Sequence, residues 1–159
     1  MIDMYKLLVA LTFCFISSVA MAQIENPVHW SFSAKKINAT TYDIVLTASI
    51  DKPWHLYSQF TGKGGPIPTS IVIKPNPLLQ VSSAKPSEVG KAEKTLDTNF
   101  GNPPIPVVYF SNEVQFVKRV TVKANVKTNV AGTIEYMVCN DRFCMPPKTD
   151  ILHISSPVK

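Results

Sequence analysis

Apolar and polar residues alternate along much of the chain, and this period of two is typical of β-strands with one buried face. Between Tyr42 and Ile50 every second residue is apolar, and the run ends at the turn sequence Asp51-Lys52-Pro53. A second run of this kind extends from Val114 to Val126. Shorter strands are predicted over residues 28–34, 54–59, 70–74, 105–110, 132–139 and 149–154.

No segment after the N-terminus has the pattern of a capped amphipathic helix. The best candidate, residues 87–97, contains Gly90 and has too few apolar positions to bury one face. Turn sequences rich in Gly, Pro and Asn separate the predicted strands, and the 13 prolines suit loops and edge strands. The pattern therefore predicts an all-β fold, an immunoglobulin-like β-sandwich.

Residues 1–22 are predicted to be a secretory signal peptide. Lys6 supplies the positive charge, residues 7–19 form the apolar segment, and Ala20-Met21-Ala22 is a cleavage site of small residues. This apolar segment is shorter than the roughly 20 residues that span a bilayer. We therefore expect cleavage and export of a single domain, residues 23–159, without a direct membrane anchor.

Removal of the signal peptide changes the cysteine count. The 159-residue chain has three cysteines, and Cys14 lies in the apolar segment of the signal peptide. The exported domain would keep one pair, Cys139 and Cys144, in a compartment where disulfides persist.

The net charge of +5 comes from lysines that stand singly or in short groups. A nucleic-acid groove is poorly supported by this distribution, and we expect a monomer that binds no nucleic acid.

The cysteine pair has only four residues between its members, so a disulfide closes a local ring. Such a ring stabilises the fold by roughly 2 kcal/mol, less than a bridge between distant strands. Asn140-Asp141 is a good turn sequence, which predicts an exposed hairpin loop. If Val138 faces the core, Cys139 faces outward and is accessible. Thiol exchange requires an accessible pair of this kind on a stiff support.

Other interpretations of the pair remain open on spacing alone. A structural hairpin disulfide is the common fate of a lone pair in an exported protein. A zinc site is disfavoured, because zinc normally takes four ligands and His153 is the only imidazole nearby, so no metal is expected. Arg142 would stabilise a thiolate and Asp141 would oppose it.

The segment from Cys139 to Pro147 resembles the active-site hairpin of the N-terminal periplasmic domain of the DsbD thiol-disulfide interchange proteins. The most specific parts are Phe143-Cys144-Met145-Pro146-Pro147 and the acidic Asp141 between the cysteines. The hairpin has one residue fewer between its cysteines than the familiar enterobacterial form. The resemblance makes Cys139 and Cys144 the expected catalytic residues.

The resemblance extends to two further segments. The sequence Trp54-His55-Leu56-Tyr57 resembles the aromatic-rich strand of the family, which implies that Tyr57 and His55 lie beside the sulfurs. Residues 97–101, from Asp97 to Phe100-Gly101, resemble the family's cap loop, in which an aromatic residue covers the cysteine pair. The acidic residue usual in that cap is replaced here by Thr98 or Asn99.

The function implied by the resemblance is periplasmic thiol-disulfide interchange by an oxidoreductase component that needs no cofactor. Cys144 would form the mixed disulfide and Cys139 would resolve it. Complete family members continue into membrane and thioredoxin-like domains, so we expect electrons to come from a separate, membrane-embedded donor of the DsbD type. The expected partners are thioredoxin-like periplasmic proteins. The alternative is a non-catalytic immunoglobulin-like binding module with a structural hairpin disulfide.

Overall fold

A computed structural model describes residues 25–123 and 127–158, so the predicted signal peptide lies outside the described residues. The described residues form strands and no helix. The strands are β1 (Val28–Lys36), β2 (Thr41–Ile50), β3 (His55–Tyr57), β4 (Ser70–Ile73), β5 (Leu79–Val81), β6 (Ser87–Gly90), β7 (Glu93–Asp97), β8 (Ile105–Phe110), β9 (Glu113–Val122), β10 (Thr128–Tyr136), β11 (Val138–Cys139) and β12 (Lys148–Val158). None of the described segments is a helix that could cross a membrane.

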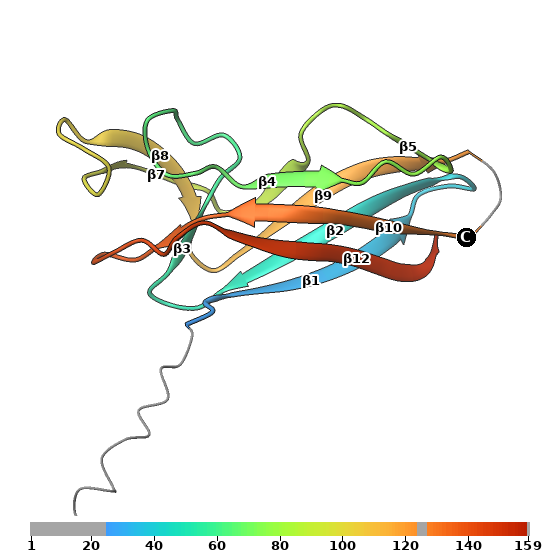
Figure 1. The fold of residues 1–159 in the computed structure, drawn as a ribbon, viewed down its shortest axis with the longest axis horizontal. Coiled ribbons are helices and arrows are strands. Elements are labelled where there is room, and N and C mark those ends of the chain that lie inside the picture. Colours follow the sequence, from blue (N-terminus) through green and yellow to red (C-terminus); the bar gives the residue numbers. More distant parts are fainter. Residues whose placement is uncertain (1–24, 124–126, 159) are drawn as a thin grey trace, which may run out of the picture.

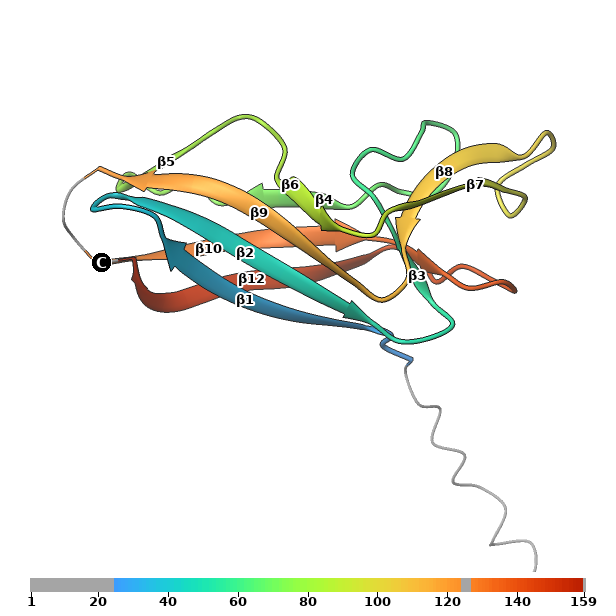
Figure 2. The same ribbon diagram turned by 180° about the vertical axis from the view of Figure 1, so that it is seen from behind.

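Two sheets form the layers of a sandwich (Figures 1 and 2). The larger sheet has the strand order β1-β2-β9-β5, and β6 also pairs with β9. The opposing sheet has the order β12-β10-β4. The predicted all-β sandwich is therefore confirmed.

The alternation in β2 and β9 explains why these strands bury one face. In β2 the even-numbered residues from Tyr42 to Ile50 are buried, and in β9 those from Val114 to Val122 are buried. Aromatic contacts join the two layers, because Trp30 of β1 packs edge-on against Tyr136 of β10 with ring centroids 5.5 Å apart. Burial of these apolar side chains supplies the main free energy of the sandwich.

A third sheet, with the order β11-β3-β8-β7, extends one end of the sandwich. Both views show β7 and β8 at the same end of the molecule as the loop between β11 and β12 (Figures 1 and 2). This sheet brings residues 55–57, 93–97, 105–110 and 138–139 together. The predicted site residues of β3, β7 and β11 therefore lie at this end.

The sequence-based strand predictions are confirmed for eight segments, with changes at their ends. The run predicted over 114–126 ends as β9 at Val122, and residues 124–126 lie outside the described part of the chain. The segment 132–139 divides into β10 and β11 around Met137. The short strands β5, β6 and β7 were not predicted. β6 and β7 expose most of their residues, and β5 has only three residues, too few for a clear alternation.

Candidate functional site

The two cysteines lie on a tight hairpin that we call the cysteine hairpin, residues 138–145. The side-chain oxygen of Asn140 accepts hydrogen bonds from the backbone N–H groups of Arg142 and Phe143, at 2.9 and 3.0 Å. The backbone N–H of Met145 donates to the carbonyl oxygen of Val138 at 2.9 Å, which closes the base. The predicted turn at Asn140-Asp141 is therefore present, and an asparagine is well suited to hold it.

Cys139 and Cys144 form a disulfide with their Cα atoms 4.0 Å apart. The Cys139 residue is fully buried, with 0% of its surface exposed, whereas Cys144 is partly exposed. The prediction that Cys139 lies on an accessible face is therefore wrong. Its side chain belongs to a second apolar cluster, separate from the main core, and that cluster covers it.

This second cluster comes from three segments that are distant in sequence. Its buried members are Tyr57, Val107 and Cys139, and the partly buried residues packed against them are Phe100, Tyr109, Met137 and Cys144. Strand pairing explains the arrangement, because Cys139 is opposite His55 and Tyr57 is opposite Tyr109. The disulfide thus lies against an aromatic surface, and we call this second cluster the disulfide cluster.

A chain of polar groups borders the disulfide cluster. The Tyr57 hydroxyl donates a hydrogen bond of 2.7 Å to the Asp97 carboxylate. His55 Nε2 lies 3.2 Å from the same hydroxyl oxygen. Because the phenolic proton points to Asp97, this oxygen accepts from His55, which assigns the imidazole proton to Nε2. Asp97 also accepts from the backbone N–H of Asn99 at 2.8 Å.

Burial sets the protonation of these aromatic groups. Burial, followed by the hydrogen bond to Asp97, raises the pKa of Tyr57 far above its ordinary value, so the phenol stays protonated. Burial lowers the pKa of His55, against the opposing effect of nearby carboxylates of which Asp97 is the first. The pKa of Tyr109 is raised, again mainly by burial. At neutral pH the site therefore presents neutral rings to the sulfurs.

The cap loop, residues 97–101, connects β7 to the segment before β8. The Phe100 ring lies edge-on to the Tyr57 ring, with centroids 6.1 Å apart, and packs against the disulfide cluster. Gly101 has a φ of +153°, a backbone conformation that residues with a side chain rarely adopt. The loop can therefore turn directly after Phe100.

The remaining residues predicted for the site lie at its rim. Phe143 is 50% exposed, and its ring meets the Trp54 ring edge-on with centroids 5.3 Å apart. Asp141 is exposed at the turn, and Pro146 is exposed beside a pocket of about 170 Å³ that Tyr136 and Met145 also line. Phe143 and Pro146 are thus exposed apolar residues close to Cys144 in the sequence.

The sequence prediction missed Val107, Tyr109 and Met137. The alternation of residues 105–110 indicates that Val107 and Tyr109 share a face, but only the pairing of β8 with β3 brings that face to the disulfide. No group of three or more metal-binding side chains was found among residues 25–123 and 127–158.

Two solved structures share the fold. The N-terminal domain of DsbD from Neisseria meningitidis, in its reduced form, has a TM-score of 0.50 and 19% identity over 80% of this chain and 86% of that chain. The N-terminal periplasmic domain of ScsB from Proteus mirabilis has a TM-score of 0.54 and 16% identity over 82% of this chain and 47% of that chain. No curated protein matches the chain.

Family membership follows from a sequence match that covers most of the chain. The family model for the N-terminal part of the thiol:disulfide interchange protein DsbD matches residues 23–156. The match includes the cysteine hairpin, the cap loop and the β3 strand described above. The chain therefore belongs to the family of N-terminal domains of the thiol:disulfide interchange protein DsbD.

Proposed function

We propose that this domain relays reducing equivalents to partner proteins through the Cys139–Cys144 pair. The observation that carries the proposal is a disulfide that bridges residues only five apart, beside a cap loop, in a domain of this family. The bridge ties no two sheets together, so its contribution to stability is limited to roughly 2 kcal/mol. A redox role accounts for its position better than a purely structural one.

The proposed reaction starts from the reduced pair and a partner disulfide. The Cys144 thiolate attacks one partner sulfur, an intermolecular S–S bond forms, and the partner's own S–S bond breaks. The thiolate of Cys139 then attacks the sulfur of Cys144, which restores the internal disulfide and releases the partner. Two electrons and two protons pass to the partner, which leaves as a dithiol.

The exposure of the two cysteines supports the proposed order of attack. Cys144 is partly exposed, whereas Cys139 is fully buried beneath the cluster of Tyr57 and Val107. Of the two residues, Cys144 is therefore the one that presents surface to a partner disulfide. This supports Cys144 as the residue that forms the mixed disulfide and Cys139 as the residue that resolves it.

In this proposal the cap loop shields the pair between encounters. Phe100 packs with the disulfide cluster through Tyr57, and a partner would have to move it to reach both sulfurs. The hydrogen bonds of Asp97 to Tyr57 and to the backbone of Asn99 fix the start of the loop. Tyr57, Asp97 and His55 are proposed as positioning residues for the cap.

The proposed location is the periplasm, reached through cleavage of the predicted signal peptide, residues 1–22. Support comes from the family and from the periplasmic domain of ScsB that shares the fold. The proposed partners are thioredoxin-like periplasmic proteins. The proposed source of electrons is a membrane-embedded donor of the DsbD type, which reduces the Cys139–Cys144 disulfide by the reverse exchange.

A comparison of two single-cysteine variants tests the proposed order of attack. The purified Cys139→Ala variant keeps only Cys144 of the pair, and the Cys144→Ala variant keeps only Cys139. Each is incubated with glutathione disulfide, and the mixed disulfide is followed by mass spectrometry. We expect Cys144 to react faster, and faster reaction of Cys139 would overturn the assignment.

A structural disulfide is the second candidate, and the complete burial of Cys139 is the observation that favours it. A structural bridge in an exported protein has a reduction potential below about −300 mV, whereas an exchange site lies above it. The potential of the folded protein therefore separates the two functions.

A further inference from the structure

One inward-facing position of the sandwich carries a charge. In β9 the residues at positions 114, 116, 118, 120 and 122 are all buried, and four of them are apolar. The fifth is Lys118, which is 8% exposed and lies between Phe116 and Val120 along the inner face. A lysine in such a row breaks the apolar pattern, and departures of this kind concentrate at functional sites.

The ammonium group of Lys118 has only a neutral partner in the described chain. It donates a hydrogen bond to the backbone carbonyl oxygen of Ala84. None of the ion pairs found among the described residues involves Lys118, and burial lowers its pKa. An ammonium has three N–H donors, so this group retains the capacity to bind an anion.

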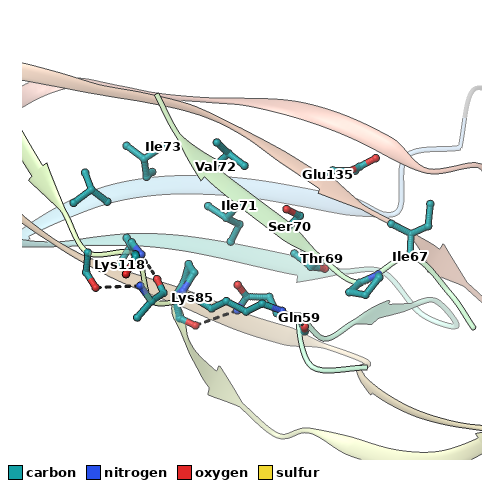
Figure 3. A pocket seen from close by; sticks show the side chains of 16 residues that line it. Gln59, Ile67, Thr69, Ser70, Ile71, Val72, Ile73, Lys85, Lys118 and Glu135 are labelled. Carbon is teal, nitrogen blue, oxygen red and sulfur yellow. Dashed lines mark hydrogen bonds between the residues drawn. The ribbon is translucent and has the colours of Figure 1, made fainter. Parts of the chain in front are cut away.

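Lys118 lies at the floor of a pocket of about 620 Å³, the volume range of ligand sites (Figure 3). One wall is β4 with the preceding residues, and the other is the segment from Val81 to Pro86. We call this pocket the β4 groove. Figure 3 shows Lys85 next to Lys118, with Glu135 across β4 from both lysines. The groove therefore combines apolar side chains of β4 and Val81 with two lysines.

The wall formed by β4 is a sheet edge. β4 pairs with β10 on one side and is the last strand of its sheet. The backbone N–H of Lys74 donates to Ala131 of β10, so the alternation of an antiparallel pair turns the N–H and C=O groups of Ile71 and Ile73 away from β10. Among the described residues these groups have no hydrogen-bond partner on that side. An exposed edge of this kind can accept an additional strand.

Alternate side chains of the edge strand point into the sandwich, towards the groove. Ile71 and Ile73 are partly buried and pack against the main core, whereas Ser70 and Val72 are exposed. A strand added beside β4 would also turn alternate side chains into the sandwich. An inward side chain in the middle of that strand would face the inner surface of β9, where Lys118 lies.

We propose that the β4 groove binds an extended peptide segment of a partner protein, with an acidic side chain that pairs with Lys118 and apolar side chains two residues to either side. The backbone of the peptide pairs with Ile71 and Ile73 of β4. The apolar side chains fill the groove between Ile71, Ile73 and Val81. β4 has four residues, which span roughly 13 Å, so a peptide of about five residues covers the whole edge with one residue to spare.

The probe that tests this site is the peptide acetyl-Val-Thr-Glu-Thr-Val-amide, titrated into the isotope-labelled oxidised protein by NMR. The matched control replaces Glu with Gln. We expect saturable shifts of the Ile71, Ile73 and Lys118 amides with the Glu peptide, and at least tenfold weaker binding of the Gln peptide. Hydrogen exchange at the Ile71 and Ile73 amides should slow when the Glu peptide is bound.

The variant Lys118→Met separates the charge from the fold, because an apolar side chain of similar length suits the inward position. It should bind the Glu and Gln peptides equally weakly, and circular dichroism checks that it is folded. The proposal is overturned if the Glu peptide gives no saturable shifts in the groove. Equal binding of the two peptides to the wild-type protein, or shifts confined to another face, would also contradict it.

Discussion

The hydroxyl group of Tyr57 donates a hydrogen bond of 2.7 Å to the carboxylate of Asp97, and both residues are buried. Tyr57 is on β3 and packs with Cys139, whereas Asp97 is the last residue of β7 and begins the cap loop. The bond therefore joins the disulfide cluster to the loop that carries Phe100.

Tyr57→Phe should destabilise the oxidised protein by about 1–3 kcal/mol, because it leaves the Asp97 carboxylate, which is 8% exposed, without its hydroxyl partner. The measurement is denaturant unfolding at neutral pH. Tyr109→Phe is the matched control, since no hydrogen bond of the Tyr109 hydroxyl was found among the described residues. A loss that is equal in the two variants would remove the special role of the Tyr57–Asp97 bond.

Phe100→Ala should expose the reduced cysteines to alkylation, because the ring packs against the cluster that contains both residues. We expect the rate with iodoacetamide to rise about tenfold, which corresponds to about 1.4 kcal/mol of lost protection. Phe60→Ala is the control, because Phe60 is an exposed aromatic residue outside the cluster. An unchanged rate in Phe100→Ala would mean that the ring does not shield the pair.

His55 should make the folded protein sensitive to mild acid. Burial lowers the pKa of His55 from its ordinary value of 6.5, so the unfolded chain takes up this proton at a higher pH than the folded chain. The contribution of neutral His55 to the free energy of unfolding is fully present above pH 6.5. It is lost as the pH falls through 6.5 towards the lower pKa of the folded state.

The test is the change in unfolding free energy between neutral and mildly acidic pH, measured for the wild type and for His55→Gln. The wild type should lose more stability than the variant. His153→Gln, which removes an exposed imidazole, is the control for the substitution itself. An equal loss in wild type and His55→Gln would show that burial of this ring does not contribute.

Gly132→Ala should weaken the attachment of β4 to β10. A methyl group at this position would overlap the carbonyl oxygen of Val72 in the adjacent strand. We expect a loss of about 1–3 kcal/mol in the free energy of unfolding, as for other overpacked positions. Gly62→Ala, where the nearest atom is at 3.4 Å, is the comparison. Equal stability of the two variants would contradict the close approach of these strands.

The strands that could be predicted from the sequence are those in which apolar residues alternate with polar ones and one face is buried. β2 and β9 are of this kind, and their apolar positions are the core of the sandwich. β6 and β7 are largely exposed edge elements, so their residues carry no periodic signal. Such strands exist because a neighbouring strand provides hydrogen bonds, which the pattern of a single segment does not encode.

The sequence motifs of the candidate site could be predicted, but the packing of side chains around the disulfide could not. The cysteine hairpin and its Asn140 turn follow from the local sequence. The burial of Cys139 does not, because alternation indicates only that its side chain leaves the main core. Its cover comes from Tyr57 and Val107, which reach it through the pairing of β11 with β3 and of β3 with β8.

Cys144→Ala should remove exchange yet leave a folded protein, because closure of the short ring contributes only roughly 2 kcal/mol. Circular dichroism and thermal unfolding of the purified variant measure this directly. The variant should show the wild-type spectrum with a lowered unfolding temperature. Loss of the folded spectrum would favour a structural role for the disulfide.

The proposed function requires that Cys139 and Cys144 exchange electrons while the domain is folded. The most direct measurement equilibrates the purified protein with glutathione and dithiothreitol buffers of graded potential, counts free thiols, and records circular dichroism on the same samples. We expect reversible reduction above about −300 mV with an unchanged folded spectrum. A pair that stays oxidised until the protein unfolds would contradict it.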